Sequence, residues 1–345
     1  GMVELPAIAA VTDSLAAAGV AHGLFADVHP NPVGADVDTG IEAFRRGDHD
    51  GIVAVGGGSA LDVGKIIAFQ AGQHRPVWDF EDVGDNWTLA DATTIAPVVA
   101  VPTTAGTGSE VGRAGVVIDE ARGRKVIVFH PGMLPSEVIC DPELTVGLPA
   151  PLTVGTGIDA LSHSLEALCT PGYHPMADGI ALEGCRLVIE HLPRVVADPA
   201  DLAARGHMMA AAAMGAVAFQ KGLGGIHALS HPISVRFGTH HGMTNAVLMP
   251  YVLEANRPAA TEPVERLARY AGIAGGFDGF LDHVVELRAS TGVPPTLVEL
   301  GVDPGARDAV AADSLAEPPA AGNPRPFTLE LASSIFDAAC SGRIG

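Results

Sequence analysis

Three consecutive glycines, Gly56 to Gly58, separate a short apolar run from an amphipathic segment early in the chain. The run at residues 52–55 is rich in β-branched residues and predicts a buried strand, and residues 62–69 predict a helix. Glycine backbones approach a ligand closely, and a helix N-terminus offers free N–H groups to an anion. The pattern therefore predicts a phosphate-binding βα turn, with Ser59 as the helix N-cap.

This turn does not follow the two best-known phosphate-binding patterns. Ile66 follows Lys65 where a Walker A loop has Ser or Thr, and Leu61 stands where the Rossmann fingerprint has its last glycine. A second segment, residues 101–110, also follows a predicted strand and holds glycines and hydroxyl side chains. Two such loops at the ends of parallel strands indicate a dinucleotide-binding crevice, although each loop alone could be an ordinary turn or helix start.

The composition changes near residue 149. Before it, predicted strands alternate with predicted helices, which favours a parallel α/β sheet; after it, Ala-, Leu- and Met-rich stretches predict helices. We therefore expect an α/β dinucleotide-binding domain at residues 1–148 and an all-helical domain at residues 149–345. The predicted strands are residues 24–28, 52–55, 98–101, 116–118, 126–129 and 138–139. The predicted helices include residues 5–18, 62–69, 176–197, 201–219 and 263–271, and residues 317–323 are a predicted loop.

Charge and cysteine content narrow the range of partners. The formal net charge of −20 disfavours binding to nucleic acid and to anionic membranes. No apolar run reaches the roughly 20 uncharged residues that span a bilayer, and the N-terminus lacks the pattern of a secretory signal. The four cysteines are widely spaced, which favours reduced thiols. We expect a cytoplasmic protein with neither a nucleic-acid nor a membrane partner.

Acidic and histidine side chains recur at helical spacing in the second part of the chain. Asp159 and His163 are four residues apart, His227 and His231 repeat that spacing, and residues 240–241 are both histidine. One carboxylate with several imidazoles suits a divalent ion such as Fe(II) or Zn(II), and the lack of thiolates favours a catalytic site. Spacing leaves open which member of each histidine pair binds; one could ligate while the other moves protons.

Together, these motifs resemble those of the iron-containing, or group III, alcohol dehydrogenases, from about residue 5 to about residue 337. The resemblance implies a Rossmann-like domain followed by an all-helical metal domain. It also implies hydride transfer between NAD or NADP and a small alcohol, aldehyde or ketone, with Fe²⁺ or alternatively Zn²⁺ as the Lewis acid. We expect a homodimer or a higher homo-oligomer. The matching motifs are residues 56–65 (GGGSALDVGK), 102–110 (PTTAGTGSE), 157–163 (GIDALSH), 227–232 (HALSHP), 241–246 (HGMTNA) and 323–330 (NPRPFTLE).

Carried over by position, the resemblance implies metal ligands at Asp159, His163, His227 and His241. It makes His231 a catalytic residue near the substrate, which we interpret as a proton carrier. Family members usually begin with a further βα unit, absent from this sequence, whose acidic residue bears on the choice between NAD and NADP. The implied cofactor contacts are Asn31, Gly56, Gly57, Gly58, Ser59, Asp62, Thr103, Thr104, Thr107 and Lys125.

Two other functions fit parts of the pattern. A lyase or cyclase of the related dehydroquinate synthase type uses its nicotinamide only transiently, so turnover would leave nicotinamide absorbance unchanged. An inactive relative would keep the metal site but lose cofactor binding, which titration with NAD and NADP would reveal.

Overall fold

The computed structural model describes residues 6–345, which divide into two compact units. The first unit contains the residues up to Thr104 together with Ser109–Thr145; the second contains Ala105–Gly108 and Val146–Gly345. This division falls close to the boundary predicted at residues 148 and 149. Leu5, where the first predicted helix begins, lies outside the described residues.

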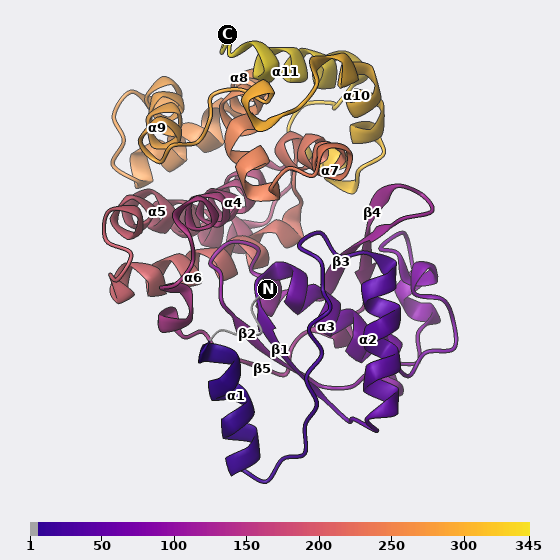
Figure 1. The fold of residues 1–345 in the computed structure, drawn as a ribbon. Helices are drawn as coiled ribbons and strands as arrows, with labels where there is room; N and C mark the ends of the chain where they lie inside the picture. Colours follow the sequence, from indigo (N-terminus) through magenta and orange to yellow (C-terminus); the bar gives the residue numbers. More distant parts are fainter. Residues whose placement is uncertain (1–5) are drawn as a thin grey trace. The chain divides into compact units, whose positions relative to one another are not determined.

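A three-stranded parallel sheet organises the first unit (Figure 1). Strands β1 (Ile52–Gly56), β2 (Val98–Pro102) and β5 (Glu137–Val138) lie in the order β1-β2-β5, and Gly56 pairs with Pro102. Because β1 and β2 are parallel and in register, the loops that follow them leave the sheet at the same edge. Helix α3 (Gly58–Gln70) begins directly after β1 and packs against α2 (Gly34–Arg46).

The predicted sheet is wrong in two places. The segments around residues 116–118 and 126–129 are strands β3 (Ala114–Asp119) and β4 (Arg124–Phe129), but they form a separate antiparallel hairpin. Their connection is far too short for the crossover of a dozen or more residues that parallel strands need. Residues 24–28 form no strand. Leu24 is exposed, and only Phe25 and Val28 of this segment pack against the core.

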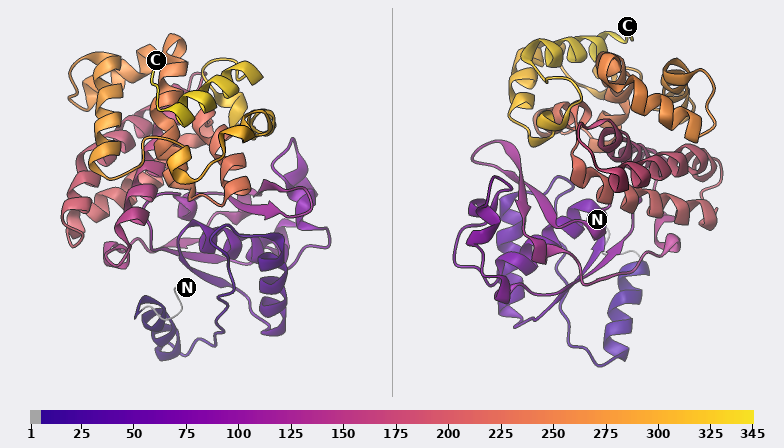
Figure 2. Two further views of the ribbon diagram at one scale, coloured as in Figure 1. Left: turned by 45° about the horizontal axis from the view of Figure 1, so that its top comes forward. Right: turned by 180° about the vertical axis from the view of Figure 1, so that it is seen from behind.

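The other elements of the first unit are peripheral to the sheet. Helix α1 (Pro6–Ala17) buries none of its residues, and an extended stretch joins it to α2 (Figure 2). Short 3₁₀ helices occupy the connections: η2 (Val77–Phe80), η3 (Asn86–Leu89), η4 (Ala92–Thr94), η5 (Ser109–Val111), η6 (Pro131–Met133) and η7 (Pro142–Thr145).

The second unit is helical, and α4 (Ala150–Cys169) is its central element, packed against α5, α6 and α8. Nearly every residue of α4 from Thr153 to Leu168 is buried, so its polar side chains lie in the interior. The other helices are α5 (Pro175–Ala197), α6 (Leu202–Ala218), α7 (Gly225–Phe237), α8 (His241–Tyr270), α9 (Gly276–Ser290), α10 (Arg307–Leu315), α11 (Leu329–Ser341), η8 (Phe219–Lys221), η9 (Val298–Leu300), η10 (Pro304–Ala306) and η11 (Pro318–Gly322).

One stretch of the second unit, Leu202–Lys221, is long and apolar enough to cross a membrane by length and composition. Half of its most apolar window is buried, and α6 packs against α4 and α5. We interpret it as a core helix of the helical unit.

Lys65 of the glycine-rich motif is buried in the first unit, with a relative exposure of 1 %, and its side chain links two segments of that unit. Its ammonium donates to the carbonyl of Ser109 at 2.9 Å and to that of Ala114, and it lies 3.3 Å from Oδ1 of Asp62. Burial lowers the pKa of Lys65, and the charges of Asp62 and Glu110 oppose that shift. The lysine thus joins α3 to the segment that follows the second glycine loop.

Replacing Lys65 by methionine is expected to destabilise the protein by about 3 kcal/mol, because it removes the cation beside the partly buried Asp62 and leaves two carbonyls without their donor. Urea unfolding followed by circular dichroism measures the loss. Lys125→Met on β4, which is only partly buried, removes the same charge and is expected to cost well under half as much. Equal losses of unfolding free energy in the two variants would argue against a stabilising role for the buried contacts of Lys65.

Candidate metal centre

Four potential metal ligands meet in the interior of the second unit. Asp159 and His163 lie on α4, His227 lies on α7, and His241 is the first residue of α8. The Nε2 atoms of His163, His227 and His241 lie 3.7, 3.7 and 3.6 Å from Oδ1 of Asp159. Two ligands of one tetrahedral ion, each at roughly 2.1 Å, are about 3.4 Å apart. The spacing therefore suits ligands that share one divalent ion.

Within this group, Asp159, His227 and His241 are the most compact set, with one ligand atom of each lying within 4.8 Å of the others. His163 lies beside them, and its ring stacks on that of His227 with 4.8 Å between centroids. Side-chain exposure is 3 % for Asp159 and 23 % for His241, so His241 is the ligand candidate most open to its surroundings.

The protonation states of the cluster also suit a cation. Burial alone would raise the pKa of Asp159, but the neighbouring histidines outweigh it, and the pKa lies well below its usual range. Burial lowers the pKa of His163 to about 4, which leaves a neutral imidazole able to coordinate. Burial would lower the pKa of His227 too, but Asp159 and Glu166 raise it to about 9. The buried Asp159 carboxylate thus favours a positive charge beside it, and the chemistry of the four side chains fits a divalent metal.

The structure places the members of each histidine pair differently. His240 is the N-cap of α8, where its Nδ1 accepts from the N–H of Met243 at 3.3 Å. His231 lies one turn beyond His227, with its ring centroid 5.9 Å from that of His227 and 5.4 Å from that of His241. Its Nδ1 lies 2.7 Å from Oε2 of Glu317. His231 therefore stands next to the ligand cluster, where a carboxylate orients it.

Three polar residues at this centre were not predicted from the sequence. Glu166 on α4 places Oε2 at 2.6 Å from Nδ1 of His227, and Asn245 on α8 donates to Oδ1 of Asp159 at 2.8 Å. Helical spacing could have indicated both, since Glu166 is three residues beyond His163 and Asn245 is four beyond His241. Glu317 had no such signal, because it reaches His231 across 86 residues of sequence.

Several of the predicted cofactor residues lie in the turns that follow β1 and β2, at one edge of the sheet in the first unit. Helix α3 begins at Gly58 with Gly57 as its N-cap, so the prediction of Ser59 as the cap is wrong. Ser59 Oγ instead donates to the Pro30 carbonyl at 2.5 Å, which brings the segment with Asn31 to this turn. Gly56 has a φ of 149°, which favours glycine, and its carbonyl accepts from the N–H of Thr103 at 2.9 Å.

Three predicted cofactor residues lie elsewhere or are already engaged. Asp62 accepts from Ser109 Oγ at 2.5 Å and from the Val116 N–H at 3.0 Å, besides its contact with Lys65. Lys125 is on β4 of the hairpin. Thr107 belongs to the short loop Ala105–Gly108, which groups with the second unit, whereas Thr104 groups with the first. Their cofactor roles stay predictions.

Comparison with known proteins gives a consistent result along the chain. Residues 1–142 match a family model described as iron-containing alcohol dehydrogenase, and residues 153–340 match the C-terminal model of the Fe-containing alcohol dehydrogenase family. A 4-hydroxybutyrate dehydrogenase of Cupriavidus necator is 40 % identical over 87 % of this chain and 80 % of its own length. An NAD-dependent methanol dehydrogenase of Bacillus methanolicus is 33 % identical over 94 % of this chain and 86 % of its own.

Solved structures agree. A 1,3-propanediol oxidoreductase superposes with a TM-score of 0.93 at 33 % identity, covering 98 % of this chain and 90 % of the other. A sulfoacetaldehyde reductase from Bifidobacterium kashiwanohense, solved with NAD⁺, has a TM-score of 0.88 at 30 % identity and covers 99 % and 89 %. The predicted α/β part followed by a mostly helical part is confirmed.

Proposed function

The chain belongs to the iron-containing alcohol dehydrogenase family, and we propose that Asp159, His163, His227 and His241 hold its metal. The protein is a nicotinamide-dependent oxidoreductase that moves a hydride between the cofactor and an alcohol or aldehyde. Nothing in the comparisons favours the lyase or cyclase alternative. Titration of the protein with NAD and NADP tests the inactive alternative, because an inactive relative would not bind the cofactor.

The observation that carries the ligand proposal is the approach of three Nε2 atoms to one buried carboxylate oxygen. An ion bound by such donors supplies Lewis acidity, which lowers the pKa of an alcohol and stabilises the alkoxide. Asp159 would contribute the negative charge that offsets a buried dication, and the histidines would contribute Nε2 lone pairs, His227 after losing a proton to solvent when the ion binds. In His227, Glu166 engages Nδ1 and so leaves Nε2 for coordination.

We propose that His231 carries the hydroxyl proton between substrate and solvent. Its ring stands 5.4 Å from that of His241, the most exposed of the proposed ligands, and Glu317 engages its Nδ1. That contact orients the ring and leaves Nε2 as the atom that gives and takes the proton. In the first unit, we propose that the turn at Gly56–Ser59 and the threonines Thr103 and Thr104 contact the cofactor pyrophosphate.

We propose a short alcohol, diol or hydroxy acid with a terminal hydroxyl as substrate. The supporting observation is the similarity to proteins named for such compounds, with the 4-hydroxybutyrate dehydrogenase at 40 % identity and the propanediol and methanol dehydrogenases at 33–35 %. Arg113 follows the second glycine loop and could bind a substrate carboxylate or serve as a structural ion-pair partner; its guanidinium lies over the Phe129 ring and its charge acts on Asp82. We therefore assign Arg113 a structural role.

Further elements of the proposal concern the whole protein. We propose a cytoplasmic homodimer or higher homo-oligomer without nucleic-acid or membrane partners, consistent with its acidic composition. We also propose that the boundary between the α/β domain and the helical domain lies between residues 148 and 149. Cofactor preference between NAD and NADP, and metal preference between iron and zinc, are outcomes of the following experiment.

The test is a panel of alcohols and aldehydes, with NAD and NADP, on protein reconstituted separately with Fe²⁺ and Zn²⁺. We expect net formation of reduced nicotinamide with short primary alcohols, and we expect 4-hydroxybutyrate to rank at or near the top. Absorbance of reduced nicotinamide measures the rate. Protein that binds metal and cofactor but changes no nicotinamide with any substrate would contradict the proposal.

A further inference from the structure

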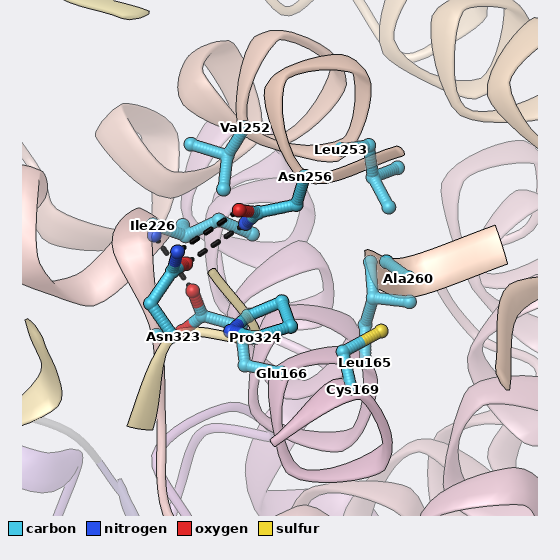
Figure 3. Close-up of a pocket in the computed structure, with 11 residues that line it drawn as sticks. Leu165, Glu166, Cys169, Ile226, Val252, Leu253, Asn256, Ala260, Asn323 and Pro324 are labelled. Carbon is cyan, nitrogen blue, oxygen red and sulfur yellow. Dashed lines mark hydrogen bonds between the residues drawn. The ribbon is translucent and has the colours of Figure 1, made fainter. Parts of the chain in front are cut away.

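The start of α7, the helix that carries His227 and His231, receives its capping groups from distant parts of the second unit. The N-cap position is Gly224, which has no side chain, although a helix start leaves several N–H groups without partners. Oε1 of Glu166 accepts the N–H of Ile226 at 2.6 Å, and Oδ1 of Asn323 accepts the N–H of Gly225 at 3.0 Å. Figure 3 shows Glu166, Ile226 and Asn323 meeting at this helix start.

Only one of these two caps also contacts a proposed metal ligand. The second oxygen of Glu166, Oε2, lies 2.6 Å from Nδ1 of His227. Asn323 is held instead by a reciprocal amide pair with Asn256, at 2.8 and 2.9 Å. The two side chains therefore share the capping role, but Glu166 alone of the two reaches the imidazole.

We propose that Glu166 is a positioning residue of the metal centre, which fixes the tautomer and the ring orientation of His227. The carboxylate accepts a hydrogen bond from Nδ1–H, so the lone pair resides on Nε2, the atom that faces Oδ1 of Asp159 at 3.7 Å. A carboxylate behind a coordinating histidine also raises its basicity and its affinity for metal. The inference rests on the proposed ligand set, because it acts through His227.

The surroundings of Glu166 hold its carboxylate in one position. Its side chain is 6 % exposed, and both oxygens accept short bonds from donors on α7. The positive end of the α7 dipole adds to the stabilisation of the charge. Apolar side chains, including Leu165, Val252 and Leu253, line a cavity beside it (Figure 3). In such a weakly polar environment a hydrogen bond to a charged group is stronger than in water.

A purely structural role, as the cap of α7, is the competing explanation, and Asn323 provides the matched control. Glu166→Gln keeps the shape but has one acceptor oxygen for two N–H donors. Asn323→Ala removes the neighbouring cap and leaves His227 with its carboxylate. Both variants are expected to lower the melting temperature of the metal-free protein, since each loses a capping group of α7.

The decisive measurement is the affinity of the metal-free, full-length protein for Zn²⁺, in competition with a chromophoric chelator. We expect Glu166→Gln to weaken zinc binding by about 10- to 100-fold, the usual effect of losing such a partner. We expect Asn323→Ala to bind zinc nearly as tightly as the wild type. With Co²⁺ in place of zinc, the visible absorption bands report ligand geometry, and they should change in Glu166→Gln and not in Asn323→Ala.

The His227→Ala variant in the same titration separates failure of this inference from failure of the ligand set. If His227→Ala weakens zinc binding and Glu166→Gln does not, the positioning role is wrong and the ligand set stands. If His227→Ala binds zinc like the wild type, the ligand set itself is wrong. Equal weakening in Glu166→Gln and Asn323→Ala would reduce Glu166 to a helix cap.

Should Glu166→Gln not fold, Glu166→Asp takes its place in the same titration. This variant keeps the charge but draws the carboxylate back by one methylene, so it cannot reach both Ile226 and His227. Wild-type zinc affinity together with an unchanged cobalt spectrum in Glu166→Asp would overturn the proposal, because the position of the oxygen is what the proposal claims.

Discussion

Replacing Asp159 by asparagine is expected to empty the metal centre and to lower kcat/KM by on the order of 10³-fold or more. The Lewis acid contributes several kcal/mol to the stabilisation of the alkoxide, and each 1.36 kcal/mol is worth about tenfold in rate. Asp159 is 2 % exposed and is the one anionic member of the proposed ligand set. An amide in its place would leave a buried dication with neutral ligands only, which is strongly unfavourable.

The measurement is the metal content of the purified variant, together with kcat/KM for the best alcohol of the panel. Asp282→Asn is the matched control, because Asp282 is an exposed aspartate of the same helical unit. It should keep its metal and its activity. Removal of metal from the wild type by a chelator should reproduce the loss in Asp159→Asn, and added Fe²⁺ or Zn²⁺ should restore activity to the wild type alone. An Asp159→Asn protein with full metal content and unchanged kinetics would refute the ligand proposal.

How far the sequence predicts this centre depends on the distance along the chain. Asp159 and His163 share one helix turn, so their common face follows from local spacing. The choice of His227 and His241 needed the family resemblance, since His231 and His240 have the same chemistry and nearly the same position. Glu317 could not be predicted from the sequence, because its contact with His231 depends on how a segment 86 residues away folds back onto α7.

The glycine-rich motif shows the same limit for the first unit. The strand, the glycine turn and the helix that follows were all predicted from local patterns, and they are present as β1 and α3. The roles within the motif were less predictable. Asp62 was predicted to contact the cofactor, yet both Asp62 and Lys65 make contacts with residues 109–116 of their own unit. Those partners are 44 to 54 residues away, and no local pattern encodes such contacts.

The prediction of strand pairing was wrong for a related reason. Residues 116–118 and 126–129 carry the apolar pattern of strands, and that part of the prediction is confirmed. Pattern alone does not say which strand is the partner, and the short connection decides for an antiparallel hairpin. Residues 24–28 have strand-like composition but no pairing partner, so the composition alone did not produce a strand.

Replacing His231 by alanine is expected to lower kcat by about 10²- to 10⁴-fold while the protein keeps its metal, because a general acid–base group contributes roughly that factor. Glu317→Gln should cause a smaller loss, since the glutamine oxygen can still accept a hydrogen bond from Nδ1–H but does not offer the charge that stabilises a protonated ring. His240→Ala is the control, because His240 caps α8 next to the ligand His241. That variant should keep kcat near the wild-type value.

The experiment measures metal content, kcat and the solvent deuterium isotope effect for His231→Ala, Glu317→Gln and His240→Ala, beside His227→Ala. If His231 carries the proton, the solvent isotope effect should change in His231→Ala while metal content stays at the wild-type level. If instead His231→Ala loses its metal and His227→Ala keeps it, the two histidines of α7 have exchanged roles. The geometry argues against that exchange, because Nε2 of His227 lies 3.7 Å from Oδ1 of Asp159, and His227 forms the compact ligand set with Asp159 and His241.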